Sequence, residues 1–177
     1  MPRTRLKEIV CTTCVMAILG ITQLHAADYI RSEMPSAKRV GEGRLTYMFW
    51  DVYDAVLYAP DGQWSQDKPY ALQLSYLRDI KGEKIADRSV QEMRNQGVDD
   101  EVKLAMWHAQ MEEIFPDVQE GDALTGLHTR EGHTVFFENG AEIGRIKDSE
   151  FSKRFFDIWL HEKTSAPDLR RKLLGMS

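Results

Sequence analysis

An arginine precedes a run of aromatic side chains in the segment GRLTYMFWDVYDAVLYAP, residues 43–60. Arg44 stands at the head of this run and Tyr53 lies within it. A guanidinium can hold a carboxylate through two parallel hydrogen bonds, and a phenol can add a third donor. The pair therefore predicts a site for an acidic ligand or for an oxyanion that develops in a reaction. The alternative is a surface arginine that pairs with a structural carboxylate such as Glu42.

The relative orientation of Arg44 and Tyr53 decides between these interpretations. Side chains alternate between the two faces of a sheet, so one unbroken strand would direct them to opposite faces. A bulge or a hairpin between them is needed for convergence. If they share a cleft, we expect Arg44 to be shielded, with its guanidinium within reach of the Tyr53 hydroxyl or of a common anion.

Other motifs with a known chemistry are scarce. The sequence contains no glycine-rich phosphate loop, no G-x-S-x-G motif and no H-E-x-x-H motif. His128 and His133 flank a predicted hairpin turn, but no third ligand stands at a spacing that zinc requires. We therefore expect neither a metal site nor a cofactor.

The first 26 residues predict a secretory signal peptide. Three basic residues precede an apolar run over residues 9–24, and small residues follow at Ala26 and Ala27. The run is shorter than the roughly 20 residues that cross a bilayer, so cleavage after Ala26 or one residue later is favoured over anchoring. We expect a periplasmic protein with no stable membrane span after cleavage.

Residues 27–177 are expected to form one domain. Cys11 and Cys14 both lie in the predicted signal peptide, which excludes thiol and disulfide chemistry from the mature chain. Of 23 Lys and Arg and 28 Asp and Glu, removal of three basic residues and one acidic residue leaves 20 and 27. This acidic balance, without a basic stripe, predicts that nucleic acid is not a partner. The oligomeric state stays open.

Hydrophobic periodicity predicts strands and helices in alternating groups. A period of two indicates a strand at 71–77, and helical spacing follows at 82–93 and 99–115. A meander of strands is expected at 122–129, 133–139 and 141–146, with helices at 149–160 and 165–175. Because strands and helices are segregated, the fold class is α+β, a large antiparallel sheet with helices packed on one face.

Local signals add detail at the ends of these elements. Asn139-Gly140 fits a two-residue type I′ turn, in which both central residues need a positive φ. Ser165 is expected to cap the last helix. The last two helices are expected to bury their apolar residues Phe155, Ile158, Trp159, Leu169 and Leu173.

Three segments resemble the bacterial chalcone isomerase-like proteins. They are Arg44 ahead of DVYDAVLY, the strand-to-helix segment YLRDI, and the terminal TSAPDLRRKLLG. The similarity extends over about residues 40–175. It implies the open-faced β-sandwich of chalcone isomerases, in which the ligand cleft lies between a large antiparallel sheet and a layer of helices.

The resemblance also implies a set of cleft residues. In the plant enzymes, an arginine and a threonine from the first long strands and a hydroxyl near the last helix line the cleft. These positions correspond to Arg44, Tyr53, and Thr164 or Ser165. The plant enzymes close a chalcone to a flavanone ring with a tyrosine, a lysine and an asparagine on the first helix. The corresponding residues here are unlike them: Lys84, Asp87 and Gln91. The electrostatic support that this ring closure needs is therefore missing.

An arginine followed by a tyrosine is similar to the fatty-acid-binding branch of the family, where the pair grips a carboxylate. The leading prediction is therefore a non-catalytic periplasmic binder of a hydrophobic, acidic small molecule such as a fatty acid. Two alternatives stay open: an isomerase or intramolecular lyase that acts on an enone-like substrate, and a structural or partner-binding module with a vestigial cleft.

Overall fold

The computed structural model describes residues 29–176. Their sheet has six antiparallel strands, each paired with the next along the chain. The strands are β1 (Ala37–Tyr47), β2 (Trp50–Pro60), β3 (Tyr70–Tyr76), β4 (Ala123–His128), β5 (Thr134–Glu138) and β6 (Ala141–Ile146). The predicted signal peptide, with both cysteines, lies outside the described residues.

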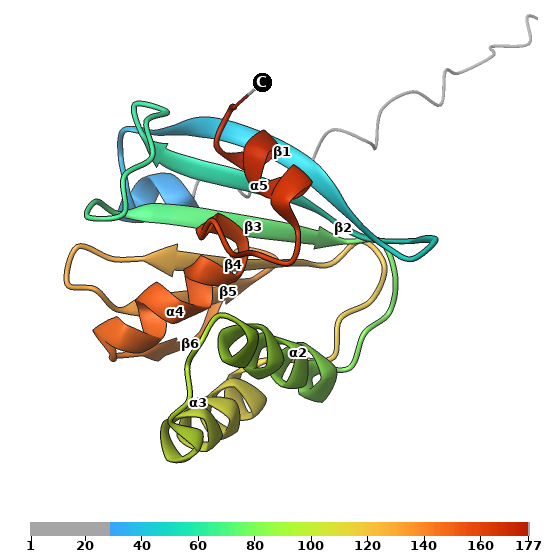
Figure 1. Cartoon of the computed structure of the whole chain (residues 1–177). Coiled ribbons are helices and arrows are strands. Elements are labelled where there is room, and N and C mark those ends of the chain that lie inside the picture. Colours follow the sequence, from blue (N-terminus) through green and yellow to red (C-terminus); the bar gives the residue numbers. More distant parts are fainter. Residues whose placement is uncertain (1–28, 177) are drawn as a thin grey trace, which may run out of the picture.

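Two pairs of helices accompany the sheet. Helices α2 (Gly82–Asn95) and α3 (Glu101–Ile114) connect β3 to β4, and α4 (Ser149–Leu160) and α5 (Pro167–Leu173) follow β6. All four lie on the same side of the sheet (Figure 1). The predicted order of elements and the α+β class are confirmed.

The main core lies between the sheet and these helices. On β2, alternate residues from Tyr53 to Ala59 are buried, as strand geometry requires when one face meets a core. Leu72, Leu74 and Tyr76 continue the same face on β3. The helices contribute, among others, the five side chains predicted to be buried: Phe155, Ile158, Trp159, Leu169 and Leu173.

A second, smaller core covers part of the opposite face, and the sequence pattern did not predict it. Residues 29–33 are helical and lie behind the sheet in Figure 1. Ile30 of this helix and Met34, which follows it, pack with Leu127 and Phe137. The Tyr29 hydroxyl lies 2.5 Å from the Thr125 hydroxyl, which ties the segment to β4.

The close approach of α5 to β1 depends on a glycine. A Cβ at Gly41 would overlap the backbone carbonyls of Lys172 and Leu173. Because Gly41 has no Cβ, the end of α5 lies directly against the strand. This contact lets Leu169 and Lys172 of the same helix line the cavity described next.

Candidate ligand-binding site

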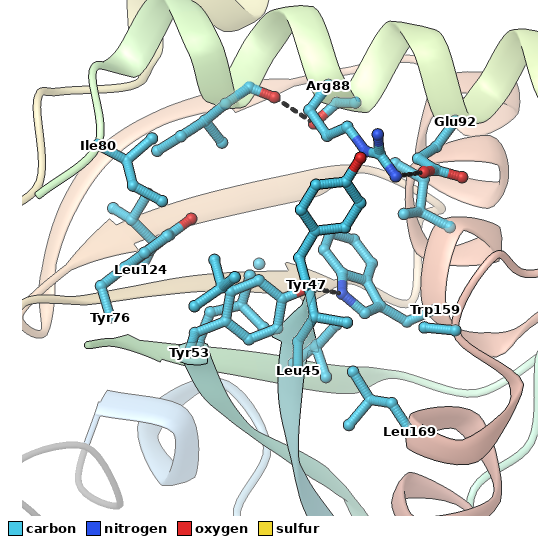
Figure 2. Close-up of a pocket in the computed structure, with 18 of the residues that line it drawn as sticks. Leu45, Tyr47, Tyr53, Tyr76, Ile80, Arg88, Glu92, Leu124, Trp159 and Leu169 are labelled. Carbon is cyan, nitrogen blue, oxygen red and sulfur yellow. Dashed lines mark hydrogen bonds and ion pairs between the residues drawn. The ribbon is translucent and has the colours of Figure 1, made fainter. Parts of the chain in front are cut away.

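A cavity of about 990 Å³ opens between the sheet and helices α2, α4 and α5. Figure 2 shows its walls, with strands on one side and helices on the other. Most of the lining is apolar and includes Leu45, Leu74, Ile80, Leu124, Phe155 and Leu169. The volume lies at the upper end of the roughly 300–1,000 Å³ of small-molecule sites. The space is therefore large enough for an extended apolar ligand.

Tyr53 brings a phenol from β2 into this cavity. Its ring packs edge-on against Tyr76, with 5.8 Å between the ring centroids. Trp159 Nε1 donates a hydrogen bond to the Tyr53 oxygen at 2.8 Å (Figure 2), which leaves the Tyr53 O–H available as a donor to a ligand. Burial raises the pKa of Tyr53 to about 12, so the phenol keeps its proton near neutral pH.

Helix α2 contributes the guanidinium of Arg88 to the lining of the cavity. Its guanidinium forms an ion pair with Glu92, one turn further along the helix, whose side chain is only 4% exposed. The same guanidinium lies over the Tyr47 ring, 5.6 Å from the centroid. Arg88 is thus held between an acid and an aromatic ring, while 55% of its side chain stays exposed. Its remaining N–H groups can bind an anion at the cavity mouth.

The predicted convergence of Arg44 with Tyr53 is wrong. A hairpin does separate them, but Arg44 pairs with Asp54 while Leu45 pairs with Tyr53. Paired residues share a face, so the two side chains project from opposite faces of the sheet. Arg44 donates two hydrogen bonds to Asp54, at 2.7 and 2.9 Å, and one to Asp51 at 2.8 Å. Although Arg44 reaches the edge of the cavity wall, its guanidinium is occupied by these carboxylates.

The alternative hypothesis, a surface arginine that pairs with a structural carboxylate, is correct for Arg44. The partner suggested for it, Glu42, is wrong. Glu42 pairs with Arg39, whose Nη1 donates to it at 2.7 Å. The side chain of Arg44 is 47% exposed, which also contradicts the shielding expected for a buried clamp.

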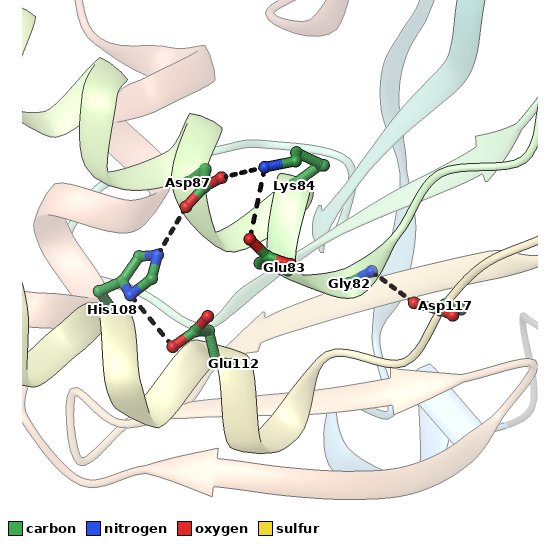
Figure 3. Close-up of polar contacts among 7 residues, drawn as sticks. All are labelled: Gly82, Glu83, Lys84, Asp87, His108, Glu112 and Asp117. Atoms are coloured by element: carbon green, nitrogen blue, oxygen red, sulfur yellow. Dashed lines mark hydrogen bonds and ion pairs between the residues drawn. The ribbon is translucent and has the colours of Figure 1, made fainter.

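Of the three positions assigned on α2, Lys84 lines the cavity, whereas Asp87 and Gln91 do not. Asp87 contacts Lys84 and the ring of His108, at 2.9 Å each (Figure 3). Gln91 donates to Asn95. A shift of one residue turns a helix by about 100°, so the residues that follow Asp87 and Gln91 lie on a different face from them. The α2 residues that line the cavity are Lys84, Ile85, Arg88, Ser89 and Glu92. Arg88 was not identified from the sequence as a residue of this face.

Thr164 and Ser165 have different surroundings. Thr164 is buried: its hydroxyl donates to the Ile158 carbonyl at 2.6 Å and accepts from the Ala166 N–H at 3.2 Å. It therefore ties the end of α4 to the start of α5. Ser165 lines the cavity, and its role toward a ligand stays a prediction. The predicted Ser165 cap is wrong, because Ala166 occupies the N-cap position without a side-chain cap.

Two further findings concern residues 29–176 alone. No group of three or more His, Cys, Asp or Glu side chains gathers there in an arrangement that could hold a metal ion. None of the helices in this part of the chain combines the length and hydropathy needed to cross a bilayer.

Comparison with known proteins identifies relatives of this architecture. Residues 26–175 match the model of the chalcone isomerase-like family. A fatty-acid binding protein of Arabidopsis thaliana has a similar structure, with a TM-score of 0.60 and 12% sequence identity, over 78% of this chain and 87% of that chain. No significant match is found among curated proteins. The family match and the structural similarity confirm the predicted fold.

Proposed function

Because this chain belongs to the chalcone isomerase-like family, we propose that its cavity binds a hydrophobic small molecule with an acidic group, such as a fatty acid, without transforming it. One observation carries the proposal: an apolar cavity of about 990 Å³ to which Tyr53 and Arg88 add a phenol and a guanidinium. Ligand sites are typically apolar with a few placed polar groups. The Arabidopsis protein of similar fold is a fatty-acid binding protein, which supports the same ligand class.

The charges at the mouth favour binding over catalysis. In this proposal, Arg88 binds the ligand carboxylate and the apolar tail lies along Leu45, Ile80 and Leu124. Arg88 already shares its charge with the buried Glu92. A nearby carboxylate weakens the support that a guanidinium could give to a developing oxyanion, and the ring closure of the plant enzymes needs such support. The carboxylate of a bound fatty acid is already ionised, so its binding requires no stabilisation of a charge that develops during a reaction.

Filling the cavity should prevent binding. Leu45 lies on β1 and lines the cavity, so we expect Leu45→Trp to weaken the binding of dodecanoate at least about tenfold, measured by titration calorimetry. Val56→Trp is the matched control, because Val56 is partly exposed and pairs with Glu42 and Gln73 on the other face of the sheet. Equal affinities for the two variants, or no binding of fatty acids of any length, would contradict the proposed function.

We further propose that the protein acts in the periplasm after loss of residues 1–26. The order of basic, apolar and small residues supports this. The protein recovered from a bacterial periplasm should have the intact mass of residues 27–177. Leu19→Arg, which interrupts the apolar run, should block processing. A soluble species that retains Met1 to His25 would sink the signal-peptide assignment.

A further inference from the structure

The turn between β1 and β2 presents an exposed apolar surface at the cavity mouth. Residues 47–50, here called the hairpin tip, are Tyr47, Met48, Phe49 and Trp50, with exposures of 57%, 76%, 93% and 63%. The hairpin extends past the neighbouring strands in Figure 1. Consecutive large apolar side chains in water indicate a contact with another apolar phase. Tyr47 belongs both to the tip and to the cavity lining.

Backbone geometry does not explain this turn sequence. Met48 has a φ of 56°, in the left-handed region that side chains with a Cβ rarely adopt. In the same sheet, the β5–β6 turn uses Asn139 and Gly140, with φ values of 48° and 90°, as predicted for a two-residue turn. The hairpin tip instead holds a methionine in this conformation. Its composition is therefore better explained by what the side chains contact than by turn formation.

Two guanidinium groups lie at the base of the tip. Arg78 is over the Trp50 ring, 5.2 Å from its centroid, and Arg88 is over Tyr47. Within residues 29–176, no ion pair involves Arg78. The cavity lining contains six Lys and Arg against three Asp and Glu, although the whole chain has an acidic excess. The nearby Asp51 is bound by Arg44 and Thr46.

We propose that the hairpin tip inserts into the surface of a lipid bilayer containing anionic lipids, so that an apolar ligand passes between the bilayer and the cavity. Tryptophan and tyrosine favour the interface between water and hydrocarbon, while Phe49 and Met48 can bury fully. Arg78, which lies over the Trp50 ring, would then face lipid phosphates. The passage of ligand rests on the proposed function, whereas the bilayer contact rests on the tip alone.

The shape of the tip favours a bilayer over a protein partner. Four side chains at the end of a projecting hairpin fall short of the roughly 800 Å² that each partner buries in a stable protein interface. A bilayer requires no complementary shape, because lipids rearrange around an inserted side chain. Binding strength then depends on the buried apolar area and on attraction to anionic lipids.

Vesicle flotation tests the contact. The exported protein, residues 27–177, is mixed with vesicles of phosphatidylcholine, with or without phosphatidylglycerol. We expect binding to the anionic vesicles, weakened by salt, and a loss of at least about tenfold for Phe49→Ser/Trp50→Ser. The control, Val102→Ser/Met106→Ser, removes two exposed apolar side chains from α3 and should bind as the unchanged protein does.

Several outcomes would overturn the proposal: no binding to anionic vesicles, equal binding with and without phosphatidylglycerol, or unchanged binding of the tip variant. A tip substitution that turns a dimer into a monomer without affecting flotation would identify a self-association surface instead. Dodecanoate titration in buffer separates the two proposals. The tip variant should keep its affinity for dodecanoate but receive ligand from vesicles more slowly. Vesicle binding without dodecanoate binding would contradict the proposed function alone.

Discussion

Arg88→Gln should weaken dodecanoate binding by about 10- to 100-fold, whereas Arg44→Gln should leave it unchanged. Hydrogen bonds to charged groups contribute about 1.5–3 kcal/mol, and Arg88 keeps N–H groups beyond its ion pair with Glu92 that can make them at the cavity. Arg44 is bound by Asp51 and Asp54 on the other face of the sheet. Titration calorimetry with dodecanoate and with dodecanol, which has no charge, measures the difference.

Glu92 requires its own control, because its buried carboxylate loses its cation in Arg88→Gln. Arg88→Gln/Glu92→Gln removes both charges and should fold, yet still bind dodecanoate weakly. Glu92→Gln alone should tighten dodecanoate binding and leave dodecanol binding unchanged, because it removes a negative charge that competes for Arg88. The circular dichroism of each variant establishes that it is folded.

The affinities of these variants show which arginine holds the carboxylate of the ligand. An unchanged affinity in the double variant would mean that Arg88 does not hold the acid group. A loss of affinity in Arg44→Gln would restore the clamp expected from the sequence and would require β1 to rearrange when ligand binds.

Leu173→Ala should lower the free energy of unfolding by about 2 to 5 kcal/mol. Leu173 is fully buried at the end of α5 and belongs to the main core. Its truncation removes apolar contacts and leaves a cavity, since the backbone of α5 at this residue is held against Gly41 of β1. Urea unfolding followed by circular dichroism measures the loss.

Leu174→Ala is the matched control, because it deletes the same atoms from the adjacent residue, which is only partly buried. Its cost should be clearly smaller. A loss below about 1 kcal/mol for Leu173→Ala would show that α5 does not dock on the sheet in solution.

Local sequence signals predicted β3 to β6, α2 to α5 and the fold class, but not the helical residues 29–33. The alternation at residues 71–77 predicted β3, and the Asn139-Gly140 pair predicted the β5–β6 turn. The buried side chains of α4 and α5 followed from helical spacing. These features depend on residues that are neighbours in the chain. The arrangement of the elements in space was predicted from the resemblance to the chalcone isomerase-like family. The core that residues 29–34 form on the opposite face has no such periodic signal.

The site depended on relations that no local pattern contains. The faces of Arg44 and Tyr53 are set by the β1–β2 pairing, which opposes Arg44 to Asp54 and Leu45 to Tyr53. A change of one residue in this register would exchange the two faces. Arg88 faces the cavity because of the rotation at which α2 packs, and a one-residue error in that rotation hides it. The amino-acid sequence shows which side chains are available for a ligand. Which of these side chains share the cavity depends on strand register and helix rotation, because both arise from packing between segments that are distant in the chain.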